Sequence, residues 1–540
     1  MKAAKRILLP LLITVILGFA YFYVTLPALN LHNPDFYIFV FMLSAAYCVI
    51  SLILNGQANL HDPRGMWASV KSTCKIPVLL CAALVVIYIL GTLFSSVILR
   101  SGSYKQLLTV ESGDFASEVE EISFDKIPML DKASAQRLGD RKLGELSDMV
   151  SQFEVANDYN QINYKAVPVR VATLEYGDVF KWFNNRKNGL PGYIIIDMIT
   201  QNVEVVRLDE GIKYSAADHF SRNIYRHLRF HYPTFLFDTP HFEIDDQGAP
   251  WWVCPRVEKT IGMFGGTDIN GAVLVNAVTG ECSYYEAAEV PTWVDLVYSA
   301  GLIIEQYDYY GKYQNGFINS MFGQTGVTVT TAGYNYIAMN DDVYMYTGIT
   351  SVGGDESNVG FILSNQRTKE TKYYSCAGAE EFSAMSSAQG VVQHLNYSAT
   401  FPLLLNIADQ PTYFMALKDN AGLVKMYAMV NVQQYNIVAT GSTVAECEAQ
   451  YHTLLSQNHI TVTPQVETVT LSGTVAEIRT AVIDGNSFYY FRLEGRAPYY
   501  AVSAADSQQA VIVNPGDRVV LTIGKDAAGD IIAAQKIELQ

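Results

Sequence analysis

Three long apolar runs dominate the pattern of hydrophobic and polar positions near the start of the chain. They extend from Ile7 to Leu26, from Tyr37 to Leu54 and from Ile76 to Leu99, and none contains Asp, Glu, Lys or Arg. Each run is close to the ~20 residues that a helix needs to cross the hydrocarbon core of a membrane. Because that core offers no water, the backbone must satisfy its own hydrogen bonds, which favours helices. The sequence therefore predicts a three-helix transmembrane anchor in residues 1–100.

The basic residues around these runs predict the orientation of the anchor. The loop at positions 30–35, between the first two runs, carries no Lys or Arg. Cytoplasmic loops are enriched in these two residue types. The N-terminal tail and the loop between the second and third runs hold six of them: Lys2, Lys5, Arg6, Arg64, Lys71 and Lys75. We expect a protein of the cytoplasmic membrane with its N-terminus inside and the residues after about 100 extracytoplasmic.

Beyond the anchor, the chain repeats itself. The segment from Gly271 to Tyr285 recurs from Gly360 to Tyr374, with Gly, Leu, Asn, Thr, Glu and both Tyr residues in register. An earlier copy begins at Gly192, and a fourth runs through residues 424–431. Repetition at a fixed period indicates one structural unit used several times.

Each copy has the pattern of strand, glycine-rich turn, strand, short turn, strand and helix. The strands alternate apolar and polar residues and are rich in Val, Ile and Tyr, as half-buried antiparallel strands are. A helix that covers one face of such a sheet makes an α+β module. We expect tandem antiparallel-sheet-plus-helix modules in residues 165–457. Residues 101–164, which are more polar, are predicted to form a helical connector.

The turn before each third strand carries a short motif. It reads Asp197-Met-Ile-Thr200, Asn276-Ala-Val-Thr279-Gly280 and Asn365-Gln-Arg-Thr368 in three copies. With its flanking strands and helix, this motif resembles the PepSY domain, a small α+β module of bacterial secreted and membrane proteins. The resemblance implies a binding or regulatory module, of a kind suspected to restrain peptidases. It implies neither catalytic residues nor a cofactor.

Residues 466–540 have a different pattern. Five strand-like runs are separated by the turn signals Asp484-Gly485-Asn486, Pro515-Gly516-Asp517 and Ala528-Gly529-Asp530. Five strands without a long helix predict a small closed β-barrel, similar to an OB-fold. OB faces that bind nucleic acid are basic. Here six Lys/Arg stand against nine Asp/Glu, so we expect no nucleic-acid partner.

Charge and cysteine content narrow the class further. Residues 1–100 hold seven Lys/Arg and two Asp/Glu, which leaves 30 and 51, a net charge of −21, for residues 101–540. Such an acidic body disfavours nucleic acid and anionic lipid as partners. Four cysteines lie in this part, and the sequence leaves open whether they form disulfides or stay free thiols: Cys254, Cys282, Cys376 and Cys447.

One group of histidines has metal-ligand spacing. His227 and His231 are four residues apart, so on a helix they would share one face, as zinc ligands do. Arg222, Arg226 and Arg229 are interleaved with them, and a cationic face repels a cation. The sequence places no third ligand, so the two histidines remain a candidate pair.

An aromatic patch is the other candidate binding site. Aromatic platforms suit sugars, peptides and membrane interfaces, although packing between repeats would use the same residues. The patch comprises Tyr307, Tyr309, Tyr310, Tyr313 and Phe317.

The chain carries no Gly-x-Ser-x-Gly elbow, Walker A loop or dinucleotide-binding glycine motif. Repeated modules without a catalytic signature predict a membrane-anchored extracytoplasmic scaffold or regulatory protein that binds a protein partner or copies of itself. Two alternatives remain: a homo-oligomeric channel or transport-associated assembly, and an extracellular metal-dependent hydrolase using His227 and His231.

Overall fold

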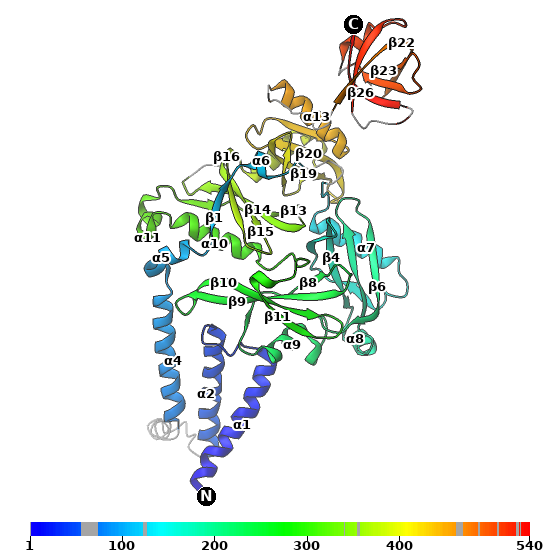
Figure 1. Ribbon diagram of the computed structural model, residues 1–540. Coiled ribbons are helices and arrows are strands. Elements are labelled where there is room, and N and C mark those ends of the chain that lie inside the picture. Colours follow the sequence, from blue (N-terminus) through cyan, green and yellow to red (C-terminus); the bar gives the residue numbers. More distant parts are fainter. Residues whose placement is uncertain are drawn as a thin grey trace. The chain divides into compact units, whose positions relative to one another are not determined.

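The computed structural model describes residues 2–55, 74–121, 127–339, 341–353, 357–458, 460, 468–483, 486–504, 507–524, 529 and 531–539. The chain is a mixed α+β protein that divides into two compact units, Met1–Gln457 and Asn458–Gln540 (Figure 1). Each unit is described by itself below.

The three apolar runs form helices α1 (Lys2–Thr25), α2 (Pro34–Leu54) and α4 (Lys75–Phe94). All three are long and apolar enough to cross a membrane. The third helix is shorter than the predicted run, because Ser95 ends it and a separate helix, α5 (Val97–Lys105), follows. The Ser95 hydroxyl donates to Gly91 O and accepts the amides of Met263 and Phe264. Arg64 and Lys71, two of the residues behind the predicted orientation, lie outside the described residues.

Four sheets follow, and the five repeated strands have the same order in each; the third sheet also has a sixth strand at its edge. In each sheet, two short strands pair with one long strand, which we call the first main strand. The first main strand forms an antiparallel ladder with the second, and the second pairs with the third. The first module contains β2 (Phe153–Val155), β3 (Asn160–Tyr164), β4 (Val167–Tyr176), β5 (Leu190–Asp197) and β6 (Val203–Ile212). The second contains β7 (Leu236–Phe237), β8 (His241–Ile244), β9 (Pro250–Ile261), β10 (Gly265–Asn276) and β11 (Cys282–Glu286).

The third module contains β12 (Thr328–Thr330), β13 (Asn335–Met339), β14 (Asp342–Ser351), β15 (Ser357–Asn365) and β16 (Thr371–Ala379). The fourth contains β17 (Ser398–Ala399), β18 (Leu403–Ile407), β19 (Gln410–Lys418), β20 (Val424–Asn431) and β21 (Val438–Gly441). The helices near these sheets are α7 (Lys132–Gly144), α8 (Val179–Asn185), α9 (Ile224–His231), α10 (Ala300–Lys312), α12 (Glu381–Val391) and α13 (Val444–Gln457).

The repeated Asp or Asn makes the same turn in all four modules. The side-chain oxygen of Asn276 accepts the backbone N–H groups of Val278 and Thr279. Asp197, Asn365 and Asn431 make the equivalent pair of bonds. This Asx turn replaces two backbone partners at the end of a strand. The fourth copy therefore has the turn even though its Thr is replaced.

The repeated glycine has a steric reason. In three modules this glycine lies at a shift in the pairing register. The shift is between the second and third strands at Gly192 and Gly360, and between the first and second strands at Gly271. A Cβ at these positions would lie 2.0–2.5 Å from a carbonyl oxygen of the neighbouring third strand. Only glycine lets the two backbones approach this closely.

Consecutive modules share hydrophobic cores, because both faces of the middle sheets are buried. In the second module, Cys254 and Val273 face the first module, whereas Val253 and Leu274 face α10 and the third. The third and fourth modules share a further core that includes Ala384 of α12. Side chains on alternate sides of a strand thus bind each sheet to two neighbours.

Residues 101–164 are not a purely helical connector. Residues Val110–Gly113 form strand β1, which pairs in parallel with β16 of the third module. Asp131 caps α7, with Oδ1 accepting Ser134 N–H, and the helix ends at Gly144. β2 and β3 belong to the first module. The polar character of this segment therefore did not reveal that it contributes sheet edges.

The second module contacts the ends of the apolar helices. Arg226 and Arg229 of α9 donate to the carbonyls of Tyr23 and Leu26, at the C-terminus of α1. Phe264, at the tip of the β9–β10 hairpin, packs on Tyr37 of α2 and Tyr88 of α4. The folded body thus lies at the end of the helices opposite the N-terminus.

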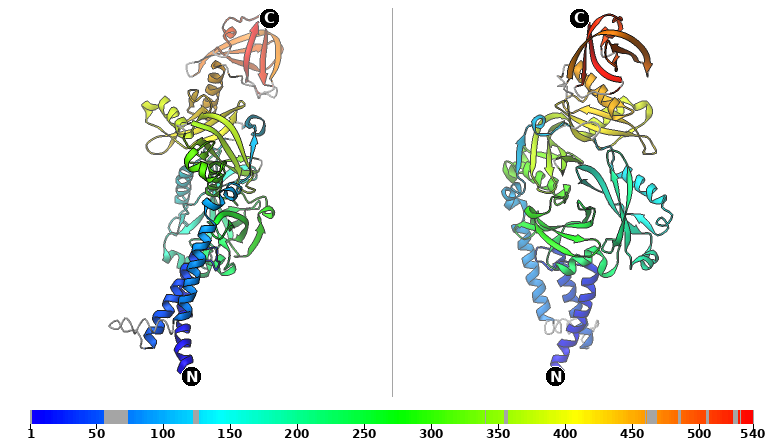
Figure 2. Two further views of the ribbon diagram at one scale, coloured as in Figure 1. Left: turned by 90° about the vertical axis from the view of Figure 1, so that its left-hand side faces the viewer. Right: turned by 45° about the vertical axis from the view of Figure 1, so that its right-hand side comes forward.

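The second unit is a five-stranded closed barrel (Figure 2). Its strands are β22 (Thr468–Ile483), β23 (Asn486–Leu493), β24 (Tyr499–Ser503), β25 (Arg518–Gly524) and β26 (Ile531–Leu539), in the order β22-β23-β24-β26-β25. Phe491, Val502 and Leu521 are fully buried inside it.

Candidate functional site

The two predicted metal-binding histidines lie on one face of α9, as their spacing requires. Asn223 begins this helix by accepting Arg226 N–H. The ring centroids of His227 and His231 are 4.3 Å apart. His227 is buried, whereas His231 is exposed.

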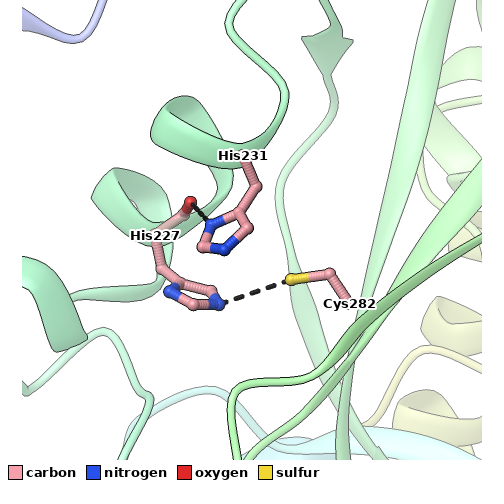
Figure 3. A group of neighbouring side chains, drawn as sticks. All are labelled: His227, His231 and Cys282. Atoms are coloured by element: carbon pink, nitrogen blue, oxygen red, sulfur yellow. Dashed lines mark hydrogen bonds between the residues drawn. The ribbon is translucent and has the colours of Figure 1, made fainter.

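Cys282, the first residue of β11, completes the group (Figure 3). Its Sγ lies 3.3 Å from His227 Nε2. The ligand atoms of His227, His231 and Cys282 all lie within 4.8 Å of one another. In the part of the chain that the structure describes, this is the group with metal-ligand spacing. One sequence feature could have revealed it: at the position of Thr371 in the third module, the second module carries Cys282.

The Asx turn of the second module positions the cysteine. Gly280, with φ +79°, directs its carbonyl toward His227, whose Nε2 lies 2.7 Å from this oxygen. A Cβ at Gly280 would lie 2.3 Å from the Tyr214 ring, which packs against His227 at 4.5 Å. Glycine is therefore required here both by the left-handed backbone and by the neighbouring ring.

Burial shifts the pKa of two members of the group, His227 and Cys282, toward their neutral forms. Burial lowers the pKa of His227, the hydrogen bond to Gly280 opposes this, and His231 lowers it further. Burial, with a contribution from Glu281, raises the pKa of the Cys282 thiol to about 11. His231 Nδ1 lies 2.8 Å from His227 O, and since a carbonyl only accepts, Nδ1 carries a proton and Nε2 is the nitrogen left to bind a metal.

The interleaved arginines do not surround the histidines as expected. Arg226 and Arg229 bind the end of α1, and Arg222 donates to Arg186 O. Cationic side chains near the C-terminus of a helix satisfy its last carbonyls and interact well with its dipole. Each guanidinium is therefore held by a backbone carbonyl and not by the two histidines, although the positive charges remain because these acceptors are neutral.

The four cysteines that follow the apolar helices are all free thiols. Cys254 and Cys282 lie in the second module, Cys376 in the third and Cys447 on α13. The question that the sequence left open is answered in favour of thiols, and Cys282 is the one placed beside two histidines.

The aromatic patch is divided between two packing clusters. Tyr307 and Tyr310 belong to the core between the second and third modules. Tyr309, Tyr313 and Phe317 pack with Tyr104 of α5, and Tyr104 and Tyr309 have ring centroids 4.7 Å apart. The patch thus links α10 to the helix that follows the third apolar span.

A cavity of about 550 Å³ lies where the first, third and fourth modules meet. It is lined by aromatic and polar residues that include Tyr159, Arg170, Tyr334, Tyr336, Phe401 and Phe414. Arg170, on β4, is 7% exposed. No sequence signal marks this residue, because the cavity that it lines is formed by residues as far apart in the chain as Pro128 and Ala416.

Among the described residues no carboxylate forms an ion pair with Arg170, although the nearby charge of Asp131 acts to raise its pKa. Its guanidinium contacts Leu130 O, Tyr159 O and Gln161 Oε1, each at 3.4 Å. The nearby carboxylate of Asp131 is engaged by Lys418 at 2.5 Å. Burial lowers the pKa of Arg170 to about 10, so the side chain is still protonated at neutral pH. A buried cation at a cavity favours an anionic ligand group.

No protein-family model matches this chain, and the comparison with curated proteins finds no match either. The function is therefore argued from the geometry of the chain itself.

Proposed function

We propose that this protein is a membrane-anchored extracytoplasmic scaffold or regulatory protein. It binds a partner protein through four PepSY-like modules, and its C-terminal OB-like barrel adds a second binding surface. The observation that carries the proposal is the cavity at the meeting point of three modules, with the buried Arg170 in its wall. The apolar helices fit a membrane location.

The proposed sidedness combines sequence and structure. Basic residues precede α1, and the body contacts the C-terminus of α1 and the residues just before α2. If the N-terminus is cytoplasmic, as the positive-inside rule requires, the modules are extracytoplasmic.

The cavity suits a short segment of a partner that carries a carboxylate. A volume of a few hundred Å³ holds one or two side chains. Arg170 would pair with the carboxylate, and the rings of Tyr336 and Phe401 would cover apolar atoms. Such a segment could be a C-terminus or an acidic side chain.

Site-specific photo-crosslinking in the native membrane tests this function. A benzophenone amino acid replaces Tyr334, which lines the cavity and is 43% exposed. In the matched control it replaces Phe180, which is 77% exposed on α8. We expect one partner protein, at fixed stoichiometry after gentle extraction, crosslinked from Tyr334 and not from Phe180.

The charge is tested with Arg170→Met, which keeps most of the side-chain volume. Loss of the Tyr334 crosslink in a variant that still folds supports recognition through Arg170. Crosslinks only between copies of this chain, in a closed oligomer, would contradict the partner-binding proposal and favour the homo-oligomeric assembly.

A further inference from the structure

We propose that His227, His231 and Cys282 bind one d¹⁰ metal ion, zinc(II) or copper(I), with a further coordination position open to solvent. This site is separate from the cavity that carries the proposed function. It stands on three side chains from two elements that converge on a single point (Figure 3).

The distances suit coordination. Zinc bonds of ~2.1 Å to nitrogen and ~2.3 Å to sulfur place neighbouring ligand atoms roughly 3.3–3.6 Å apart in a tetrahedron. His227 Nε2 and Cys282 Sγ are already 3.3 Å apart. The whole set lies within 4.8 Å, so a side-chain rotation of the exposed His231 closes the site.

The outer contacts orient the ligands. His231 Nδ1–H donates to His227 O, which leaves Nε2 as the ligand atom. Metal-binding histidines commonly donate their second N–H to a carbonyl in this way. His227 must move its proton from Nε2 to Nδ1, which exchanges its bond to Gly280 O for a bond to the metal.

The ligand set selects the class of ion. Imidazole and thiolate bind zinc and copper(I), whereas magnesium and calcium require oxygen ligands. The S–H bond of the Cys282 thiol breaks, the proton leaves to solvent and the resulting thiolate bonds to the metal, so one proton is released for each ion bound. No oxidant or reductant takes part.

The position of the site gives the ion a structural consequence. Cys282 belongs to the second sheet, and α9 holds the end of α1 through Arg226 and Arg229. A metal that joins α9 to β11 would therefore fix the sheet to α9 and, through Arg226 and Arg229, to the end of α1.

The test uses the full-length protein in detergent, purified without a histidine tag and stripped of metal with a chelator. Calorimetric titration with zinc(II), and anaerobic titration with copper(I) against a chromogenic chelator, measure stoichiometry and identify the tighter ion. Cobalt(II) reports thiolate ligation through its charge-transfer absorption. We expect one ion per chain and a thiolate band with cobalt.

His231→Ala and Cys282→Ser should each weaken binding by at least about 10- to 100-fold, and Cys282→Ser should abolish the cobalt band. His394→Ala, an exposed histidine of the fourth module, is the matched control and should bind like the parent. Because His231 is exposed, its replacement decides the question even if Cys282→Ser unfolds. Absence of stoichiometric binding, or equal binding by His231→Ala, would overturn the proposal.

Discussion

The third strands of the second and third modules, β11 and β16, begin after the same Asx turn but carry different side chains at the first position. In β16, Thr371 bonds to Ser364 at 2.7 Å within its own sheet. In β11, Cys282 lies beside His227 of a helix from outside the sheet. The backbone is the same in both because the same Asn and Gly residues hold it. The comparison shows that the backbone places the first residue of the third strand in the same way in both modules. The side chain at this position then decides whether it bonds within its own sheet, as Thr371 does, or lies beside a histidine, as Cys282 does.

The equivalence of the two backbones predicts the largest effect. Gly271→Val and Gly360→Val should each destabilise the folded body by roughly 2–4 kcal/mol, since the new side chain would strike the carbonyl of Tyr285 or Tyr374. Gly301→Ala is the control, because no atom lies within 4 Å of its Cβ position. Thermal unfolding of the full chain in detergent measures all three. If either valine variant unfolds at the same temperature as the parent protein, the glycine does not have the same steric role in the two modules.

The second prediction concerns the chemical difference. Zinc at 100 times its dissociation constant should stabilise the parent protein by about 2.7 kcal/mol. Cys282→Thr gives the second module the residue of the third, and this variant should gain almost no stability from zinc. Thr371→Ser, at the equivalent position of β16, should respond like the parent. The shift of the unfolding midpoint with zinc reports each response.

A third comparison concerns the segments that link the modules. Asp218, before α9, and Asp295, before α10, are both buried carboxyls whose pKa is raised by burial. For Asp218 the pKa rises to about 6, although Trp182, Ser215 and Arg222 oppose the shift. Trp182 Nε1 donates to its carboxyl at 3.1 Å.

The folded chain therefore binds a proton at Asp218 that the unfolded chain, with a pKa near ~3.9, has lost. The free energy of unfolding should fall as the pH rises from about 4 to about 6, by on the order of 2 kcal/mol. Asp218→Asn should flatten the curve across this range. Urea unfolding at a series of pH values checks it, and an unchanged pH profile in the variant would refute the assignment.

The smallest effect on stability is expected at Lys369, in the turn just before β16. Lys369 has φ +64°, where the second module has Gly280. Its ammonium contacts both carboxylate oxygens of Asp268, at 2.7 and 2.8 Å. Lys369→Gly removes this ion pair but relieves a left-handed backbone, so stability should change by less than about 1 kcal/mol. A larger loss in urea unfolding would show that the ion pair holds the two modules together.

Local patterns were sufficient for several features. The apolar runs predicted the three candidate spans to within a few residues, except where Ser95 ends the third. The repeated Asn and Gly predicted equivalent modules, because an Asx turn and a β-bulge each need a particular residue.

The sequence by itself determined the features whose physics is local: span length, strand alternation, turns and caps. The tertiary structure decided which distant residues meet. It brought Cys282 to a histidine 55 positions away, turned Arg226 and Arg229 toward α1, and enclosed Arg170 among three modules. These outcomes depend on which faces of the sheets pack together, and no short window of residues contains that information.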